Sequence, residues 1–373
     1  MVGIRTATCG LVLTIVLTGV GAPPRLSARG GAARTPRPET IKYPGGKPPS
    51  SAQVELGRQL FFDKRLSANR LMSCATCHQL ERGFGDGLRL SVGVTGKEMK
   101  RHTPHLFNLA WAPTLFWDGR AISLEDQALA PIQAPDELGL PIDEAVKRLE
   151  AVPDYRAAFA QLFPRSGVTP RAIAAAIAAF ERTIMAADSA FDRYEAGETS
   201  ALSASAVSGM ALFFGRAQCS TCHSGPTFTD GLFHNTGVRG EDRGRAAFDR
   251  VGEFQMRPYP FFQTQKAFKT PGLRNVALTA PYLHDGSEPT LADVVRFYNQ
   301  GGKDRPTAAA TSSGLSLDVR PLHLSDTEMA DLVAFLESLT SPVTITRPVL
   351  PPDGGALQIL TADLRQQFPA SKK

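Results

Sequence analysis

The chain has 373 residues, 42% of them hydrophobic and 21% charged, which is the composition of an ordinary globular protein with room for about two domains. Its formal net charge of +5 is small and dispersed, so the sequence gives no reason to expect a nucleic-acid partner.

The first 28 residues are typical of a cleaved secretory signal peptide. Arg5 gives a positive start, and the apolar stretch 11–20 is too short to span a bilayer as a stable helix. Small residues follow, with a suitable cleavage site at Leu26–Ala28; an uncleaved membrane anchor is the alternative. Residues 29–50 are rich in Pro, Gly and Arg, which predicts a flexible leader. We therefore expect a periplasmic protein.

Removal of the signal peptide would leave four cysteines, and all of them lie in C-x-x-C-H motifs. The two motifs consist of Cys74, Cys77 and His78, and of Cys219, Cys222 and His223. This is the attachment pattern of haem c: two thiols bond to the porphyrin vinyl groups, and the following His ligates the iron. A zinc site, a redox-active dithiol and structural disulfides are alternatives, but none of them requires the adjacent His twice. The sequence therefore predicts two covalently bound haem c groups.

The two motifs lie in an internal repeat. Gly57–Phe62 precedes the first motif and Gly209–Phe214 precedes the second, each as the end of an amphipathic helical pattern. Ala172–Met185 has helical apolar spacing, and Ser325–Glu328 is a capping box that begins a last helix. No alternating strand pattern is visible. We expect a mainly α fold with two cytochrome c-like domains, 51–188 and 189–345, each carrying one haem, followed by a tail at 346–373.

Beyond the haem motifs, several strings resemble one family, the bacterial dihaem cytochrome c peroxidase and MauG superfamily. The resemblance extends from about Gln53 to about Pro342. Its most specific strings are Ser73–His78, Arg101–Pro104, Phe116–Arg120, Asp126–Ala128 with Pro131 and Ile132, and Leu273–His284. It implies that the N-terminal haem, on His78, reacts with hydrogen peroxide and that the C-terminal haem, on His223, transfers electrons.

The resemblance also assigns the peroxide pocket. Glu137 matches the catalytic carboxylate, which moves a proton between the two peroxide oxygens before the O–O bond breaks. Gln127 would hydrogen-bond peroxide, Pro131 would pack over the iron, and Trp117 would relay electrons between the haems. Without the family strings, Glu137 would be interpreted as a solvated loop carboxylate and Trp117 as a core residue.

Two positions depart from the typical peroxidases. Tyr298 stands where those proteins carry a Met ligand of the second iron, as in MauG-type members, and a phenolate ligand favours oxidised iron. A core Tyr298, with Met329 or another Met as ligand, is the alternative. Val94 stands where many members carry a His that blocks the first iron, which implies an open iron unless His102 or His105 binds it.

Two further positions concern calcium and the route to a substrate. The family often holds a calcium ion, for which Thr279 and Pro281 match the carbonyl ligands, but the Asn ligand is replaced by His102, and imidazole is a poor ligand for a hard cation. MauG-type proteins carry an exit Trp two residues before the second motif, where this chain has Ala217.

These patterns predict a peroxidase that receives electrons from a small donor protein, a c-type cytochrome or a cupredoxin, and that could be a homodimer as family members often are. A MauG-like oxidase acting on a protein substrate is the second hypothesis. A dihaem electron carrier, with both irons six-coordinate, is the third.

Overall fold

The computed structural model describes residues 40–41, 43–248, 264–303, 315–316 and 318–352. The expected signal peptide, most of the leader and the tail from residue 353 lie outside this part of the chain. Within it, no helix is both long enough and apolar enough to cross a membrane.

The N-terminal half is helical and has its own core. Its helices are α1 (Ser51–Phe62), α2 (Cys74–Cys77), α3 (Leu124–Gln133), α4 (Ile142–Glu150), α5 (Pro153–Leu162) and α6 (Pro170–Glu181), with 3-10 turns at Pro44–Gly46, Lys64–Leu66, Leu80–Arg82 and Leu109–Trp111. Leu60, Ile132, Phe159 and Ile173 are fully buried in one cluster between these helices. Helix α6 ends four residues before the predicted Met185, because the chain turns at Thr183, whose hydroxyl donates to the Phe180 carbonyl at 2.7 Å.

The C-terminal half has a second core and the only paired strands among the described residues. Its elements are α7 (Ala190–Glu195), α8 (Ala204–Phe214), α10 (Leu291–Asn299), α11 (Asp326–Glu337), the two-residue strands β1 (Phe233–His234) and β2 (Phe268–Lys269), and 3-10 turns at Cys219–Thr221, Arg245–Ala247 and Val276–Leu278. The strands pair antiparallel. Aromatic rings dominate the core, where Phe213 lies 5.0 Å from Phe335 between ring centroids. The predicted capping box at the start of α11 is confirmed: Ser325 and Glu328 bond reciprocally.

The repeat seen in the sequence corresponds to two equivalent helix crossings. A Cβ atom on Gly57 of α1 would lie 1.8 Å from the carbonyl oxygen of Ala176 on α6. A Cβ atom on Gly209 of α8 would lie 1.8 Å from the carbonyl oxygen of Asp331 on α11. Each glycine therefore allows two helix backbones to touch, in the helix that precedes a haem motif. The mainly helical fold is confirmed.

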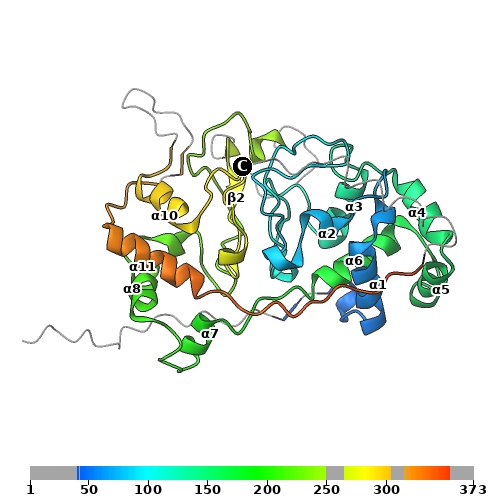
Figure 1. Cartoon of the computed structure of the whole chain (residues 1–373), viewed down its shortest axis with the longest axis horizontal. Helices are drawn as coiled ribbons and strands as arrows, with labels where there is room; N and C mark the ends of the chain where they lie inside the picture. The colour runs from blue at the N-terminus through cyan, green and yellow to red at the C-terminus, as the bar shows by residue number, and fades with distance from the viewer. Residues whose placement is uncertain (1–39, 42, 249–263, 304–314, 317, 353–373) are drawn as a thin grey trace, which may run out of the picture. The chain divides into compact units, whose positions relative to one another are not determined.

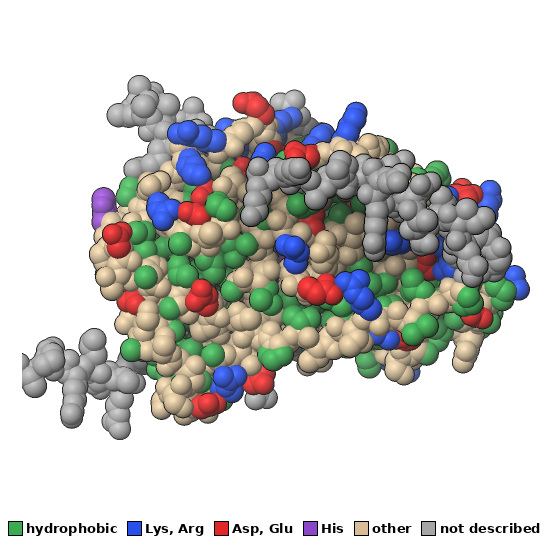
Figure 2. Space-filling model, in the orientation of Figure 1, with side chains coloured by type: hydrophobic (Ala, Val, Ile, Leu, Met, Phe, Trp, Pro, Cys, Tyr) green, Lys and Arg blue, Asp and Glu red, His purple; other side chains and the backbone are tan. Residues whose placement is uncertain are grey.

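The chain after α11 returns to the N-terminal half. In Figure 1 this orange-to-red segment runs from α11 towards α1. Val343, Ile345 and Leu350 pack against the cluster that contains Phe61 and Phe62, and the Arg58 guanidinium donates to the Thr346 carbonyl at 2.8 Å. The start of the predicted tail thus belongs to the packed structure. The visible surface mixes acidic and basic side chains, in keeping with the small net charge (Figure 2).

Candidate haem and peroxide site

The first C-x-x-C-H motif forms a single helical turn after α1. Ser73 precedes α2, and its backbone N–H donates to the Thr76 hydroxyl at 2.9 Å, which fixes the start of the turn. The His78 Nδ1 atom lies 2.9 Å from the Phe84 carbonyl. Because a carbonyl can only accept, Nδ1 carries the hydrogen and Nε2 keeps its lone pair for a metal. Burial lowers the pKa of His78, so the imidazole stays neutral, as a ligand must be.

The second motif repeats this arrangement. The His223 Nδ1 atom lies 3.0 Å from the Phe228 carbonyl, and burial lowers the pKa of this imidazole as well. Both Phe84 and Phe228 have positive φ angles, 62° and 56°, which turn their carbonyls towards the His rings. These two carbonyl partners could not be predicted from the sequence, because the backbone rather than the Phe side chain makes the contact.

One cavity of about 1130 Å³ connects the two motifs. All thirteen residues predicted for haem attachment, iron ligation, peroxide chemistry and calcium line it: Cys74, Cys77, His78, Trp117, Gln127, Pro131, Glu137, Cys219, Cys222, His223, Thr279, Pro281 and Tyr298. Ordinary small-molecule pockets measure ~300–1,000 Å³, so this space suits large prosthetic groups. The four cysteines are free thiols, which leaves them available for thioether bonds. The residues therefore fit two haem c groups.

The alternatives to haem fit less well. Burial raises the pKa of Cys77 and of Cys219 to about 12, so neither thiol is a ready thiolate for zinc or for redox exchange. Within the described ranges, the one group with metal-like spacing is Cys222, Asp230 and His234, whose ligand atoms lie within 4.8 Å of one another. It uses one cysteine of the second motif and leaves Cys219 out, so it does not explain the motif. His234 is instead paired with Asp230 at 2.8 Å.

The predicted peroxide pocket is built by α3 and the loop after it. Gln127 and Pro131 lie on α3, and Glu137 follows, where its backbone carbonyl accepts from the Val94 N–H at 2.8 Å. The side chains of Gln127 and Glu137 make no hydrogen bond with any residue that the structure describes, yet both line the cavity. Burial raises the pKa of Glu137, while the positive charge of Arg120 opposes the rise.

Arg120 is a residue whose role the sequence analysis missed. It lies 3.5 Å above the Phe116 ring and bonds Asp118 through both carboxylate oxygens at 3.1 and 3.0 Å. Its charge is thereby held beside Glu137. The sequence string Phe116–Arg120 contained it, but only the structure shows that its charge acts on a carboxylate elsewhere in the chain.

The two histidines considered as blocking ligands have other partners. Both ring nitrogens of His105 are engaged, Nε2 with the Gly272 carbonyl at 2.9 Å and Nδ1 with the Phe107 N–H at 3.2 Å. The Nδ1 atom of His102 donates to the Leu88 carbonyl at 3.0 Å. These nitrogens are therefore already in use, and the open first iron stays a prediction.

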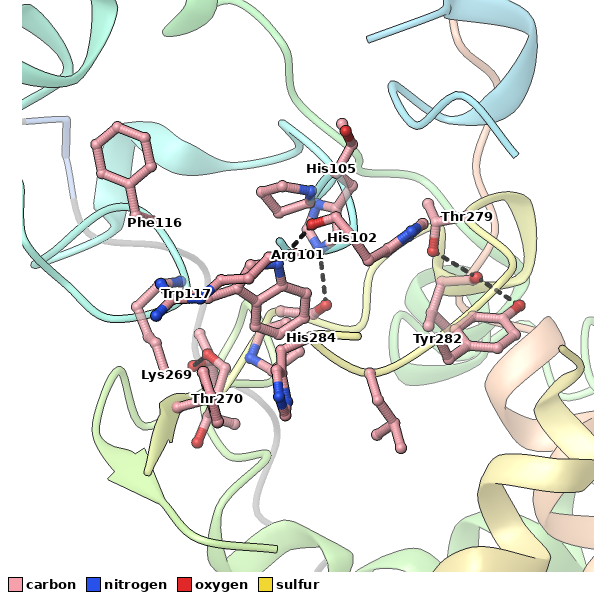
Figure 3. A pocket seen from close by; sticks show the side chains of 18 of the residues that line it. Arg101, His102, His105, Phe116, Trp117, Lys269, Thr270, Thr279, Tyr282 and His284 are labelled. Atoms are coloured by element: carbon pink, nitrogen blue, oxygen red, sulfur yellow. Dashed lines mark hydrogen bonds between the residues drawn. The ribbon is translucent and has the colours of Figure 1, made fainter. Parts of the chain in front are cut away.

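Trp117 lies where the two halves meet. Its indole Nε1 donates to the His102 carbonyl at 2.8 Å, and its ring meets His284 edge-on with centroids 6.5 Å apart (Figure 3). His284 in turn stacks on Phe268 at 3.5 Å. Lys269, also missed by the sequence analysis, donates its backbone N–H to the Trp117 carbonyl at 2.7 Å. Its ammonium makes no hydrogen bond or ion pair with any residue that the structure describes, and burial lowers its pKa to about 8.

Tyr298 lies near the end of α10 and faces the second motif. Burial, then the neighbouring Cys222 and Cys219, raise the pKa of its phenol, while a hydrogen bond with Thr236 opposes the rise. Met329, the alternative ligand, does not line the cavity, and its sulfur accepts from the Asn299 amide at 3.4 Å. Tyr298 is therefore the better placed of the two.

Several known proteins are similar to this chain. Residues 51–200 match the family model described as di-haem cytochrome c peroxidase. The chain is 43% identical to the methylamine utilization protein MauG of Methylorubrum extorquens over 86% of this chain and 87% of that protein. It is 33% identical to the cytochrome c551 peroxidase of Pseudomonas aeruginosa over 92% and 94%. Among solved structures, a MauG-like protein associated with microbial copper homeostasis matches with a TM-score of 0.71 at 35% identity, covering 84% of this chain and 95% of that one.

These relatives include both a MauG protein and a cytochrome c peroxidase, and each aligns with most of this chain. The chain is a member of the dihaem cytochrome c peroxidase and MauG superfamily.

Proposed function

We propose that the protein is a periplasmic dihaem peroxidase that reduces hydrogen peroxide at the His78 haem with electrons relayed through the His223 haem. Two electrons and two protons convert one peroxide molecule into two waters. The electrons would come from a small donor protein, a c-type cytochrome or a cupredoxin. Assembly as a homodimer remains a prediction.

The observation that carries this proposal is the pair of unengaged polar side chains, Gln127 and Glu137, in the cavity beside the first motif. When bound there, haem would supply the redox chemistry of peroxide cleavage. Glu137 would take the proton from the near peroxide oxygen and return it to the far one, which then leaves as water. The Gln127 amide would orient the peroxide, and Pro131 would close the face of the haem without offering a ligand.

Arg120 would keep this proton transfer in a useful pH range. Burial raises the pKa of the Glu137 carboxyl and so favours its protonated form, which cannot accept a proton from peroxide. The guanidinium, fixed by Asp118, favours the carboxylate. The two opposing effects leave a carboxyl group that can both accept and return a proton.

A MauG-like oxidase is the second candidate, and Tyr298 is the observation that favours it. A Tyr facing the second haem site suits a protein that stores oxidising equivalents instead of passing electrons inward. The 43% identity to MauG of Methylorubrum extorquens points the same way. Ala217, which is 4% exposed, stands where the MauG-type exit Trp would be, so the substrate of MauG does not carry over.

The test of the proton-transfer role is Glu137→Gln, which keeps the shape and removes the base. We expect the rate of reaction with peroxide to fall by roughly two to four orders of magnitude, with both haems still attached. Glu150→Gln, which changes an exposed carboxylate at the end of α4, is the matched control and should react like the parent. A Glu137→Gln rate within a few-fold of the parent would remove Glu137 from the mechanism.

An EPR spectrum of the oxidised protein tests whether the first iron is open. One high-spin and one low-spin ferric haem, without a Met–iron band in the optical spectrum, would support an open His78 iron and Tyr298 on the other iron. Two low-spin haems would mean that a ligand blocks the first iron, which leaves either a peroxidase that needs reductive activation or an electron carrier. Steady oxidation of a small cytochrome by peroxide would then separate the peroxidase from the MauG-like oxidase.

A further inference from the structure

The two halves of the protein meet along a seam of two loops. Gly83 of the first half abuts the second half so closely that a Cβ atom on it would lie 2.8 Å from the Leu278 Cβ. A Cβ atom on Gly286 would lie 2.4 Å from the Arg89 carbonyl oxygen, and the Arg89 guanidinium donates to the Asp285 carbonyl at 3.2 Å. Backbone therefore faces backbone across the seam.

His102 lies in this seam and bonds to both halves. It is 5% exposed, and its backbone N–H donates to the His284 carbonyl at 2.7 Å. Its backbone carbonyl accepts from the Trp117 indole at 2.8 Å, and its ring Nδ1 donates to the Leu88 carbonyl at 3.0 Å. The ring points towards Thr279 of the second half (Figure 3). Loss of the ring would remove contacts from both sides at once.

The residues around the ring do not fit a calcium ion. Calcium takes ~6–8 oxygen ligands, and the site would need the carbonyls of Thr279 and Pro281 together with a side-chain oxygen at position 102. Position 102 supplies nitrogen instead, and its N–H already uses the Leu88 carbonyl. The nearest buried carboxylate, Asp86, is turned to its own loop, where it accepts from the Leu88 N–H at 2.9 Å.

We propose that the His102 side chain takes the place of a metal ion at this seam, so that the protein binds no calcium there and needs none. The ring donates to the Leu88 carbonyl and points towards Thr279, so it supplies a hydrogen-bond donor where a cation would supply charge. The same residue holds the Trp117 indole through its backbone. The orientation of Trp117 is therefore fixed by the protein alone.

The direct test uses the full-length protein with both haems attached. After dialysis against EGTA, calcium chloride is titrated in a calorimeter, and thermal unfolding is followed in EGTA and in 1 mM calcium, a concentration of about the order that weak extracellular sites require. We expect no binding isotherm and a Tm that is the same in both buffers. Micromolar calcium binding, with a Tm several degrees lower in EGTA, would overturn the proposal.

The variant His102→Asn tests whether the ring is what excludes the cation. Asn offers the missing side-chain oxygen, so we expect this variant to bind calcium and to show a Tm that falls in EGTA. His105→Asn is the matched control, because it also removes a buried imidazole bonded to a backbone carbonyl, in this case that of Gly272. Its Tm should fall equally with and without calcium. A His102→Asn protein that does not bind calcium, and whose Tm is the same in EGTA and in calcium, would show that the imidazole does not substitute for the ion.

Discussion

Replacing Gly209 with Ala should destabilise the protein and disturb the second haem selectively. The added methyl group would lie 1.8 Å from the Asp331 carbonyl oxygen, where ordinary contact begins at 3.4 Å, so α8 and α11 must move apart. Overpacking of this kind costs ~1–3 kcal/mol, and the rigid backbone on the far side places this case at the upper end. Since Ala gains up to ~1 kcal/mol over Gly in a helix, the net loss in free energy of unfolding is about 2 kcal/mol.

The assay compares Gly209→Ala with Gly57→Ala, in which the same close approach occurs between α1 and α6. Urea denaturation of the haem-containing protein measures the free energy, and EPR reports each iron separately. We expect Gly209→Ala to shift the signal of the His223 haem, because α8 leads directly into that motif, and Gly57→Ala to shift the signal of the His78 haem. Ser208→Ala changes an exposed neighbour on α8 and is the control.

Two outcomes would refute this reasoning. A Gly209→Ala protein as stable as the Ser208→Ala control would mean that the helix crossing tolerates a side chain. Equal effects of Gly57→Ala and Gly209→Ala on both haem signals would mean that a helix crossing does not influence the haem motif that follows it. The equivalence of the two crossings would then have no consequence for the haems.

Three other predictions concern buried groups. The rate of peroxide reaction should rise with pH through a pKa above 4.5, because burial raises the pKa of the Glu137 base; stopped-flow profiles that are flat from pH 5 to 7 would contradict this. Tyr298→Phe should convert the second haem to a high-spin form in optical and EPR spectra, and an unchanged spectrum would exclude the phenol as ligand. Glu181 is 4% exposed with a pKa raised to about 8, so the free energy of unfolding should fall as pH rises from about 4.5 to 8, by roughly 1.4 kcal/mol per pKa unit traversed. Glu181→Gln should abolish that slope in urea titrations at several pH values.

The sequence predicted those features that depend on local spacing. A C-x-x-C-H motif carries its chemistry within five residues, so both haem sites were visible without a structure. The repeat at Gly57 and Gly209 was equally visible, since each glycine begins a Gly-x-x-Leu-Phe-Phe string in the helix before a motif. The capping box at Ser325 is local as well, and it begins α11 as expected. In each case the residues that matter are neighbours in the chain.

Other features depend on contacts between distant segments and could not be predicted in this way. The end of α6 before Met185 follows from a turn that the apolar pattern does not encode. The return of Val343 and Ile345 onto the first core has no motif, because a few apolar residues in a Pro-rich stretch resemble any linker. Arg120 became interpretable only when the fold brought its charge near Glu137.

The same distinction applies to the proximal and distal sides of each haem site. The proximal side of each haem site is encoded locally, by a His next to the attachment cysteines and a carbonyl five or six residues later. The proposed distal residues come from distant segments, α3 and its loop for the first site and α10 for the second. Distal residues such as Glu137 and Tyr298 can therefore change without disturbing haem attachment. This independence explains how one scaffold can serve both a peroxidase and a MauG-like oxidase, and it places the decision between them on the distal side chains.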